Sequence, residues 1–139
     1  MTTTYLDYNA TAPVWPEVVE AVSRALAVGG NASSVHREGR AARQMVEESR
    51  EKVAALVNAK PGQVIFTGGG TEANNLAMLQ ADPSGGAASP IEHESVLQSL
   101  DHGAQLRVQA DGIVDVNSLP QQPVRLVSVM LANNETGVV

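Results

Sequence analysis

The sequence predicts an α/β fold built around a mainly parallel β-sheet. Segments whose apolar residues recur at helical spacing alternate along the chain with short apolar segments that are typical of strands. The segment 124–131 (VRLVSVML) is apolar almost throughout, as expected for a strand that is covered on both faces. Turns rich in glycine, proline or asparagine separate these segments. Together these observations favour a parallel α/β sheet, and no internal repeat or clear linker divides the chain.

Two helices are expected in the first half of the chain. Pro16 suits the first turn of a helix, and Gly29 with Gly30 suits its end. A longer helical pattern runs from about residue 34 to residue 58 and carries an apolar stripe. Gly39 lies inside this pattern, at a position where the helix could kink or divide.

Strands and helices are expected to alternate in the second half. The segment 63–67 (QVIFT) is predicted to be a compact strand, and the glycine-rich turn after it leads into a helix that contains Leu76. The segment 82–90 is turn-prone and is expected to hold at most a rudimentary strand. The remaining elements are expected in this order: a helix near 94–101, a strand near 105–109, a helical turn near 116–119 and the strand 124–131.

Composition excludes several classes of protein. The 139 residues are enough for one domain with a core, and 43% of them are hydrophobic, which argues against disorder. A net charge of −6 argues against nucleic-acid binding, and without cysteine the chain has neither disulfides nor thiolate ligands. No apolar run reaches the roughly 18 residues of a membrane span, and no signal peptide is visible, so a cytoplasmic location is the default.

The glycine-rich turn at 68–70 is the strongest candidate for a ligand site. In α/β sheets, ligands bind where strands end and helices begin. Three glycines let a ligand approach the backbone closely, and the following helix offers free N–H groups together with the Thr71 hydroxyl. Phosphate is the natural ligand of such a site. A plain tight turn capped by Thr71 is the alternative, and from this segment alone both remain open.

A dinucleotide site is a rival interpretation of the same turn. Gly68, Gly70 and Ala73 fit the Gly-x-Gly-x-x-Ala fingerprint, and Glu92 or Glu94 follows about 20 residues later. That fingerprint is short, and it requires the acidic residue to end a proper second strand. A Walker-type loop is excluded because no Gly-Lys-Ser/Thr sequence occurs.

Two further loops carry polar side chains that could contact a ligand. His93 lies at an expected strand-to-helix junction, where it could stack on a ligand ring or transfer protons, or simply begin a helix. Asn133 and Asn134 follow the apolar strand, where their amides could bind a heteroaromatic ring or close a turn. His36 and His102 lack the spacing of metal ligands, so no metal site is predicted.

In their joint order, these segments resemble the N-terminal portion of NifS/IscS-like cysteine desulfurases in the class V aminotransferase family, which use pyridoxal 5′-phosphate. The resemblance implies a fold-type-I, three-layer α/β/α architecture that is incomplete here. It also implies that 1–15 packs with the small domain and that 16–139 is the first part of the large domain. The matching segments are 5–11, 30–36, 39–43, 46–56, 64–76, 91–93 and 126–139.

The resemblance assigns roles to four residues of the predicted cofactor site. Gly70 and Thr71 would hold the phosphate, which is the anion site already argued from the turn. His93 would stack on the pyridine ring and could assist proton transfer. Asn134 would donate a hydrogen bond to the phenolic oxygen of the ring.

The resemblance also implies an activity: sulfur passes from L-cysteine to an enzyme persulfide and L-alanine is released, for iron–sulfur cluster assembly or thiolation. A sulfur-acceptor protein and a homodimer are implied partners, and a selenocysteine lyase is a related possibility. The sequence departs from the family pattern in having Leu131 where many members have histidine, and in a short stretch between Asn75 and Glu92.

The catalytic cysteine and a credible Schiff-base lysine are absent, because only Lys52 and Lys60 occur and they fall on a helix and at a turn. We therefore expect this chain to be a truncated portion that is inactive alone. Two alternatives stay open: a non-catalytic remnant or interaction module, and a small nucleotide-binding domain.

Overall fold

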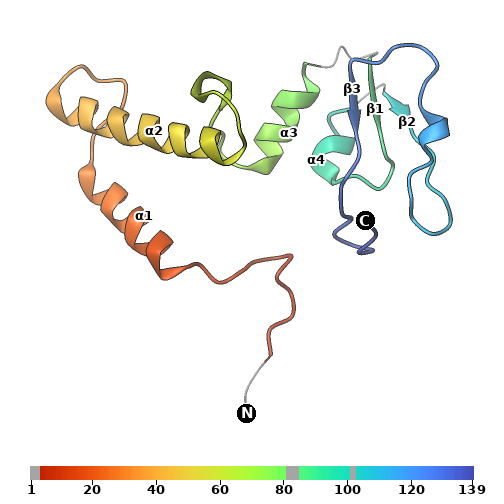
Figure 1. Cartoon of the computed structure of the whole chain (residues 1–139), viewed down its shortest axis with the longest axis horizontal. Helices are drawn as coiled ribbons and strands as arrows, with labels where there is room; N and C mark the ends of the chain where they lie inside the picture. Colours follow the sequence, from red (N-terminus) through yellow and green to blue (C-terminus); the bar gives the residue numbers. More distant parts are fainter. Residues whose placement is uncertain (1–3, 81–84, 101–102) are drawn as a thin grey trace. The chain divides into compact units, whose positions relative to one another are not determined.

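The computed structural model describes residues 4–80, 85–100 and 103–139. The chain forms two compact units, Met1–Phe66 and Thr67–Val139 (Figure 1). Within the described residues, the first unit contains two helices and a short 3₁₀ turn, and the second contains two helices, a second 3₁₀ turn and a small sheet. The assignment of 1–15 and 16–139 to different domains of a complete enzyme stays a prediction.

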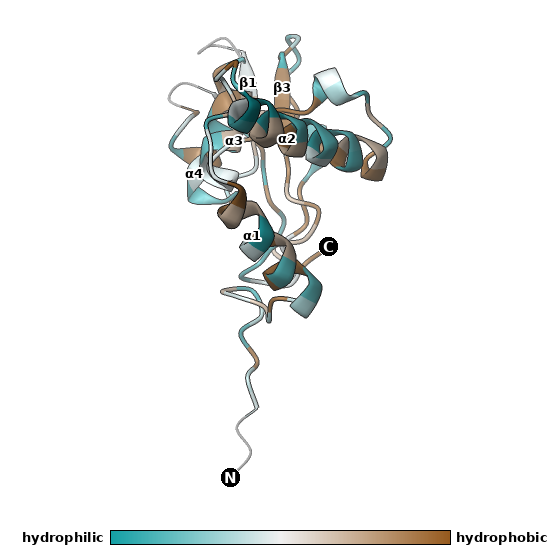
Figure 2. Cartoon of the chain, turned by 90° about the vertical axis from the view of Figure 1, so that its left-hand side faces the viewer, coloured by the Kyte–Doolittle hydropathy of each residue, from teal (hydrophilic) through white to brown (hydrophobic). Residues whose placement is uncertain are grey.

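Helix α1 spans Pro16–Val28, as predicted. Proline occupies its first turn, and Gly29 ends it with a positive φ of 59° that favours glycine. None of its residues is buried, and Leu26 is 80% exposed. Figure 2 shows hydrophobic residues next to hydrophilic ones along this helix. The apolar side chains of α1, among them Val18, Val19, Val22 and Leu26, are therefore exposed in the described structure.

Helix α2 spans Arg37–Leu56 as one continuous helix. It begins later than expected because Asn31 forms a turn first: its side-chain oxygen accepts the N–H of Ser33 at 2.9 Å, and its carbonyl accepts the N–H of Ser34 at 2.9 Å. Gly39 neither kinks nor divides the helix. A Cβ at this position would lie 2.3 Å from the Ser34 carbonyl oxygen, so glycine lets the turn pack directly on the first helical turn.

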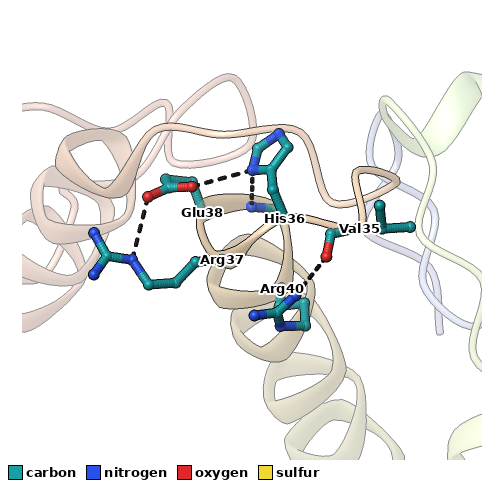
Figure 3. A network of polar contacts seen from close by, with 6 residues as sticks. Val35, His36, Arg37, Glu38 and Arg40 are labelled. Atoms are coloured by element: carbon teal, nitrogen blue, oxygen red, sulfur yellow. Dashed lines mark hydrogen bonds and ion pairs between the residues drawn. The ribbon is translucent and has the colours of Figure 1, made fainter.

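A polar network surrounds the start of α2 (Figure 3). His36 is the N-cap, and its Nδ1 lies 3.3 Å from the N–H of Gly39 and 3.2 Å from the Glu38 carboxylate. Nδ1 accepts from Gly39 when it is unprotonated and donates to Glu38 when it carries a proton, so it makes one bond at a time. The pKa of Glu38 is lowered, first by its own backbone N–H and then by the Arg37 side chain, 3.2 Å away.

The prediction of a strand at 63–67 is wrong. Pro61–Gln63 forms a 3₁₀ turn, and the N–H of Val64 donates to the Pro61 carbonyl at 3.1 Å. The Val64 carbonyl accepts from Arg50, whose guanidinium carbon lies 5.0 Å from the centre of the Phe66 ring. The N–H and the carbonyl of Val64 are thus bonded to the 3₁₀ turn and to Arg50. No described strand pairs with residues 63–67. An apolar sequence alone does not make a strand without a partner.

The sheet of the second unit has three short strands, β1 (Gly86–Ala88), β2 (Ala104–Gln105) and β3 (Leu126–Ser128). Their order is β2-β1-β3, and both pairings are parallel (Figure 1). The predicted parallel sheet is therefore confirmed. The expected rudimentary strand within 82–90 is its central strand, although residues 81–84 lie outside the described part.

Strand lengths are shorter than the apolar patterns suggested. The three residues of β1 pair with Leu126, Val127 and Ser128, so the predicted strand 124–131 forms only over these positions. The predicted strand 105–109 forms over Ala104–Gln105, and an isolated antiparallel bridge joins Val108 to Val114. Because strands exist only where hydrogen-bonded neighbours exist, the central strand limits the other two.

Helices α3 (Gly70–Met78) and α4 (Glu94–Leu97) contact each other in the second unit. The predicted helical turn is a 3₁₀ turn at Val116–Ser118. Met78, Ala88 and Val96 form the buried cluster, and Leu100 and Leu126 pack against it. This core is aliphatic, in a sequence of which only 3% is aromatic, and it fixes α3 and α4 relative to the central strand.

Candidate functional site

The glycine-rich turn forms an open cradle before α3. The N–H of Gly68 donates to the Glu72 carboxylate at 2.6 Å, and the Thr67 hydroxyl donates to the Gly69 carbonyl at 3.1 Å. A Cβ at Gly69 or Gly70 would meet no atom within 4 Å, and neither residue has a left-handed φ. The glycines therefore leave space beside the backbone rather than permit an unusual conformation.

The start of α3 offers hydrogen-bond donors to a ligand. Within the described residues, no protein acceptor takes the N–H groups of Gly70, Thr71 or Glu72, and the exposed Thr71 hydroxyl is not engaged either. These N–H groups point along the axis of a nine-residue helix, whose dipole favours negative charge at this end. The site can bind an anion such as phosphate. The Glu72 carboxylate is the one negative group that lines it.

His93 caps the start of α4 and is held by Ser95. Its Nδ1 accepts the backbone N–H of Ser95 at 3.1 Å and lies 2.8 Å from the Ser95 hydroxyl. The backbone N–H of His93 donates to the Glu92 carboxylate at 3.3 Å. The imidazole is exposed but oriented by these contacts.

The structure brings three of the four predicted site residues together. Thr71 and His93 line one hollow of about 480 Å³, and Gly70 and Thr71 line a second one of about 480 Å³. Asn75 also lines both, so the two hollows adjoin around α3. A phosphate at the helix start and a ring beside His93 could be held at the same time.

Asn134 lies outside these two hollows. It is exposed, and its amide donates to the Glu135 carboxylate at 2.8 Å. The buried Asn133 instead closes the turn: its side-chain oxygen accepts the N–H groups of Glu135 and Thr136 at 2.9 and 2.8 Å. Its amide donates to the Ile91 carbonyl at 2.9 Å. For Asn133 the turn-closing interpretation is therefore correct, while the cofactor role of Asn134 stays a prediction.

Two contacts of this site were not predicted from the sequence. The Asn74 amide donates to the Ser95 hydroxyl at 2.8 Å, which links α3 to the histidine loop. The Ser128 hydroxyl donates to Glu92 at 3.1 Å. Both contacts join segments that lie far apart in the sequence, so no local signal predicts them. The Glu92 carboxylate is already bonded, which does not favour the ribose role that a dinucleotide site would give it.

A separate apolar hollow of about 400 Å³ lies beside the end of β3. Ile91, Ile113, Val129, Leu131 and Val139 are among its lining residues, and none of the four predicted site residues lines it. Its lining offers few hydrogen-bond donors, so it does not suit an anion.

In the described residues, no group of three or more acidic or histidine side chains could hold a metal ion. Among the described residues, no helix is long and apolar enough to cross a membrane.

The fold and the site define an α/β unit in which a helix start with unengaged N–H groups has a histidine beside it. Residues 4–139 match the class-V aminotransferase family, and the chain belongs to that family. It is 40% identical to an IscS-like cysteine desulfurase from Mycobacterium tuberculosis, over 97% of this chain and 40% of that protein. It is 35% identical to human selenocysteine lyase, over 97% of this chain and 38% of that protein.

A solved structure of a NifS-like protein from Rickettsia africae is also similar. The TM-score is 0.85 with 32% identity, over 96% of this chain and 41% of that chain. This chain thus spans about two fifths of the length of its relatives. The alignment with the Mycobacterium tuberculosis protein covers 157 positions, more than the 139 residues of this chain. That relative therefore contains residues within the matched region that this chain lacks.

Proposed function

We propose that this chain is the part of a cysteine desulfurase that binds the phosphate and one ring face of pyridoxal 5′-phosphate. The observation that carries the proposal is the grouping of Gly70, Thr71 and His93 around the start of α3, in a chain that belongs to the class-V aminotransferases. Unengaged N–H groups fit a phosphate, and an exposed imidazole in the adjoining hollow fits an aromatic ring.

Each residue has a distinct task in this proposal. The N–H groups of Gly70 and Thr71 and the Thr71 hydroxyl bind and orient the phosphate. His93 packs against the ring, and the nitrogen not held by Ser95 can hold a proton for transfer to the substrate. The cofactor, when bound, supplies an electron sink for the substrate's α-carbon. Asn134 is proposed to donate a hydrogen bond to the phenolic oxygen of the cofactor ring and so to tune the electron sink.

The covalent part of the reaction depends on residues that this sequence does not contain. Its two lysines, Lys52 and Lys60, lie on α2 and at the start of the 3₁₀ turn, and neither lines a hollow beside Thr71 or His93. The sequence has no cysteine to receive sulfur. We therefore propose that the 139 residues bind the cofactor without a covalent bond and do not release alanine from L-cysteine.

The complete activity is proposed for a protein that also supplies the remaining three fifths of the family fold. That protein would transfer sulfur from L-cysteine to its own cysteine, release L-alanine and pass the sulfur to an acceptor protein for iron–sulfur cluster assembly or thiolation. A homodimer and a cytoplasmic location are parts of the same proposal. Release of alanine from L-cysteine by the purified 139-residue chain would contradict the proposal that this chain is inactive alone.

Titration of the purified chain with pyridoxal 5′-phosphate tests the binding site. We expect saturable binding that inorganic phosphate displaces and that Thr71→Ala weakens about tenfold, since one charge-assisted hydrogen bond contributes roughly 1.5 kcal/mol. Ser49→Ala is the matched control, because it removes an exposed hydroxyl that bonds only within α2. Binding of NAD alone would instead favour the nucleotide-binding alternative, and binding of neither would favour a non-catalytic remnant.

A further inference from the structure

Ser95 connects the predicted cofactor-stacking histidine to helix α3. It is 8% exposed and lies between His93 and Asn74, contacting both through one hydroxyl. We propose that Ser95, oriented by Asn74, is a positioning residue that holds the neutral His93 ring with its proton on Nε2. The functional meaning of this inference rests on the proposed function of His93, but the arrangement itself can be tested without the cofactor.

The backbone determines what Nδ1 of His93 can do. The N–H of Ser95 lies 3.1 Å from Nδ1, and a backbone N–H can only donate. Nδ1 must therefore present its lone pair in this conformation. In a neutral imidazole only one nitrogen carries a proton, so the proton is on Nε2.

The hydroxyl of Ser95 extends the same pattern. The Asn74 amide donates to the hydroxyl oxygen at 2.8 Å, and this occupies one of its lone pairs. The hydroxyl hydrogen is then free to point at Nδ1, which is 2.8 Å away, and it shares the single lone pair of Nδ1 with the backbone N–H of Ser95. Donors therefore follow one direction, from Asn74 to Ser95 to His93, and hydrogen bonds aligned in one direction strengthen one another.

The position of the proton determines which group of the His93 ring is available to a ligand. Nε2 makes no hydrogen bond to a described residue, so its N–H remains available. His93 is the N-cap of α4, a short helix of four residues. The hydrogen bond from Asn74 to Ser95 links α4 to α3. A second link, in which the Ser99 hydroxyl donates to the Asn75 side chain, joins α3 to the turn that follows α4 and does not touch His93.

Long-range ¹H–¹⁵N correlation spectra of the full chain, labelled with ¹⁵N-histidine, measure the tautomer. Spectra are recorded at increasing alkaline pH until they stop changing, and the His93 signals are assigned by their loss in His93→Gln. We expect the Nε2–H form to dominate in the unmodified chain. Ser95→Ala is expected to lower the ratio of Nε2–H to Nδ1–H about fivefold, as for the loss of one hydrogen bond.

Matched variants separate positioning from general damage. Ser95→Thr keeps a hydroxyl and should restore the ratio, and Asn74→Ala should lower it in the same direction as Ser95→Ala. Asn75→Ala removes the neighbouring link and should leave the ratio unchanged. The inference is overturned if the unmodified chain shows Nδ1–H, or if neither Ser95→Ala nor Asn74→Ala changes the ratio. Failure of pyridoxal 5′-phosphate to bind, with the tautomer as expected, would overturn the proposed function and leave this positioning intact.

Discussion

Gly39 gives the sharpest test of how the first unit is packed. An added Cβ would lie 2.3 Å from the Ser34 carbonyl oxygen, 2.7 Å from the Ser34 Cβ and 2.8 Å from the Asn31 carbonyl oxygen. All three are backbone or Cβ atoms, so no flexible side chain can move aside. Overpacking of this kind costs about 1–3 kcal/mol. Displacing the turn also strains the His36 cap, which is worth about 1 kcal/mol.

Helix propensity acts in the opposite direction. Alanine is favoured over glycine by at most about 1 kcal/mol inside a helix. The expected net effect of Gly39→Ala is therefore a destabilisation of about 2 kcal/mol. Urea unfolding followed by far-UV circular dichroism measures it, with Gly62→Ala as the control, since a Cβ there meets nothing within 4 Å. A neutral or stabilising Gly39→Ala would refute the close packing of turn and helix.

Three further substitutions test the second unit and the α2 start. Asn133→Ala removes the hydrogen bonds of a buried amide to the Ile91 carbonyl and to the N–H groups of Glu135 and Thr136, and it should cost about 2–3 kcal/mol in urea unfolding. The exposed Asn134→Ala is the control and should change stability by less than about 0.5 kcal/mol. Glu38 has a lowered pKa in the folded chain, so its stabilisation is complete above the ordinary glutamate pKa and is lost as pH falls through the lowered value. Glu38→Gln should therefore lose less stability than the unmodified chain over that acid range in pH-dependent melting. Glu72→Gln removes the negative charge that lines the phosphate cradle and should tighten pyridoxal 5′-phosphate binding about two- to fivefold in titration; weaker binding would mean that the carboxylate's bond to Gly68 matters more.

Local sequence signals were sufficient for several elements. Proline in a first turn and glycine after the last turn marked the ends of α1 correctly, because both residues act on their own backbone. The glycine-rich turn also marked the start of α3, although its glycines leave space beside the backbone and do not adopt a left-handed φ. The long pattern of α2 was predicted three residues too early, since the turn at Asn31–Ser34 comes before the cap at His36.

Strands were the elements that sequence predicted least well. Segment 63–67 is as apolar as a strand, yet its backbone is used by a 3₁₀ turn and by Arg50. The segment 124–131 pairs only at Leu126–Ser128, because its partner β1 has only three residues. A helix satisfies its hydrogen bonds within one segment, but a strand depends on a neighbour that its own sequence does not describe.

The sequence by itself determined the family resemblance, the existence of helices α1, α2 and α3 and the residue types of the predicted cofactor site, since these depend on short motifs and local patterns. Only the tertiary structure decided which side chains meet. Thr71 lines a hollow with His93, Asn74 bonds Ser95 across 21 residues, and Asn133 rather than Asn134 is buried in the turn after β3. These contacts arise from the packing of α3 against α4 around a shared core, and such long-range contacts are not encoded in any single segment.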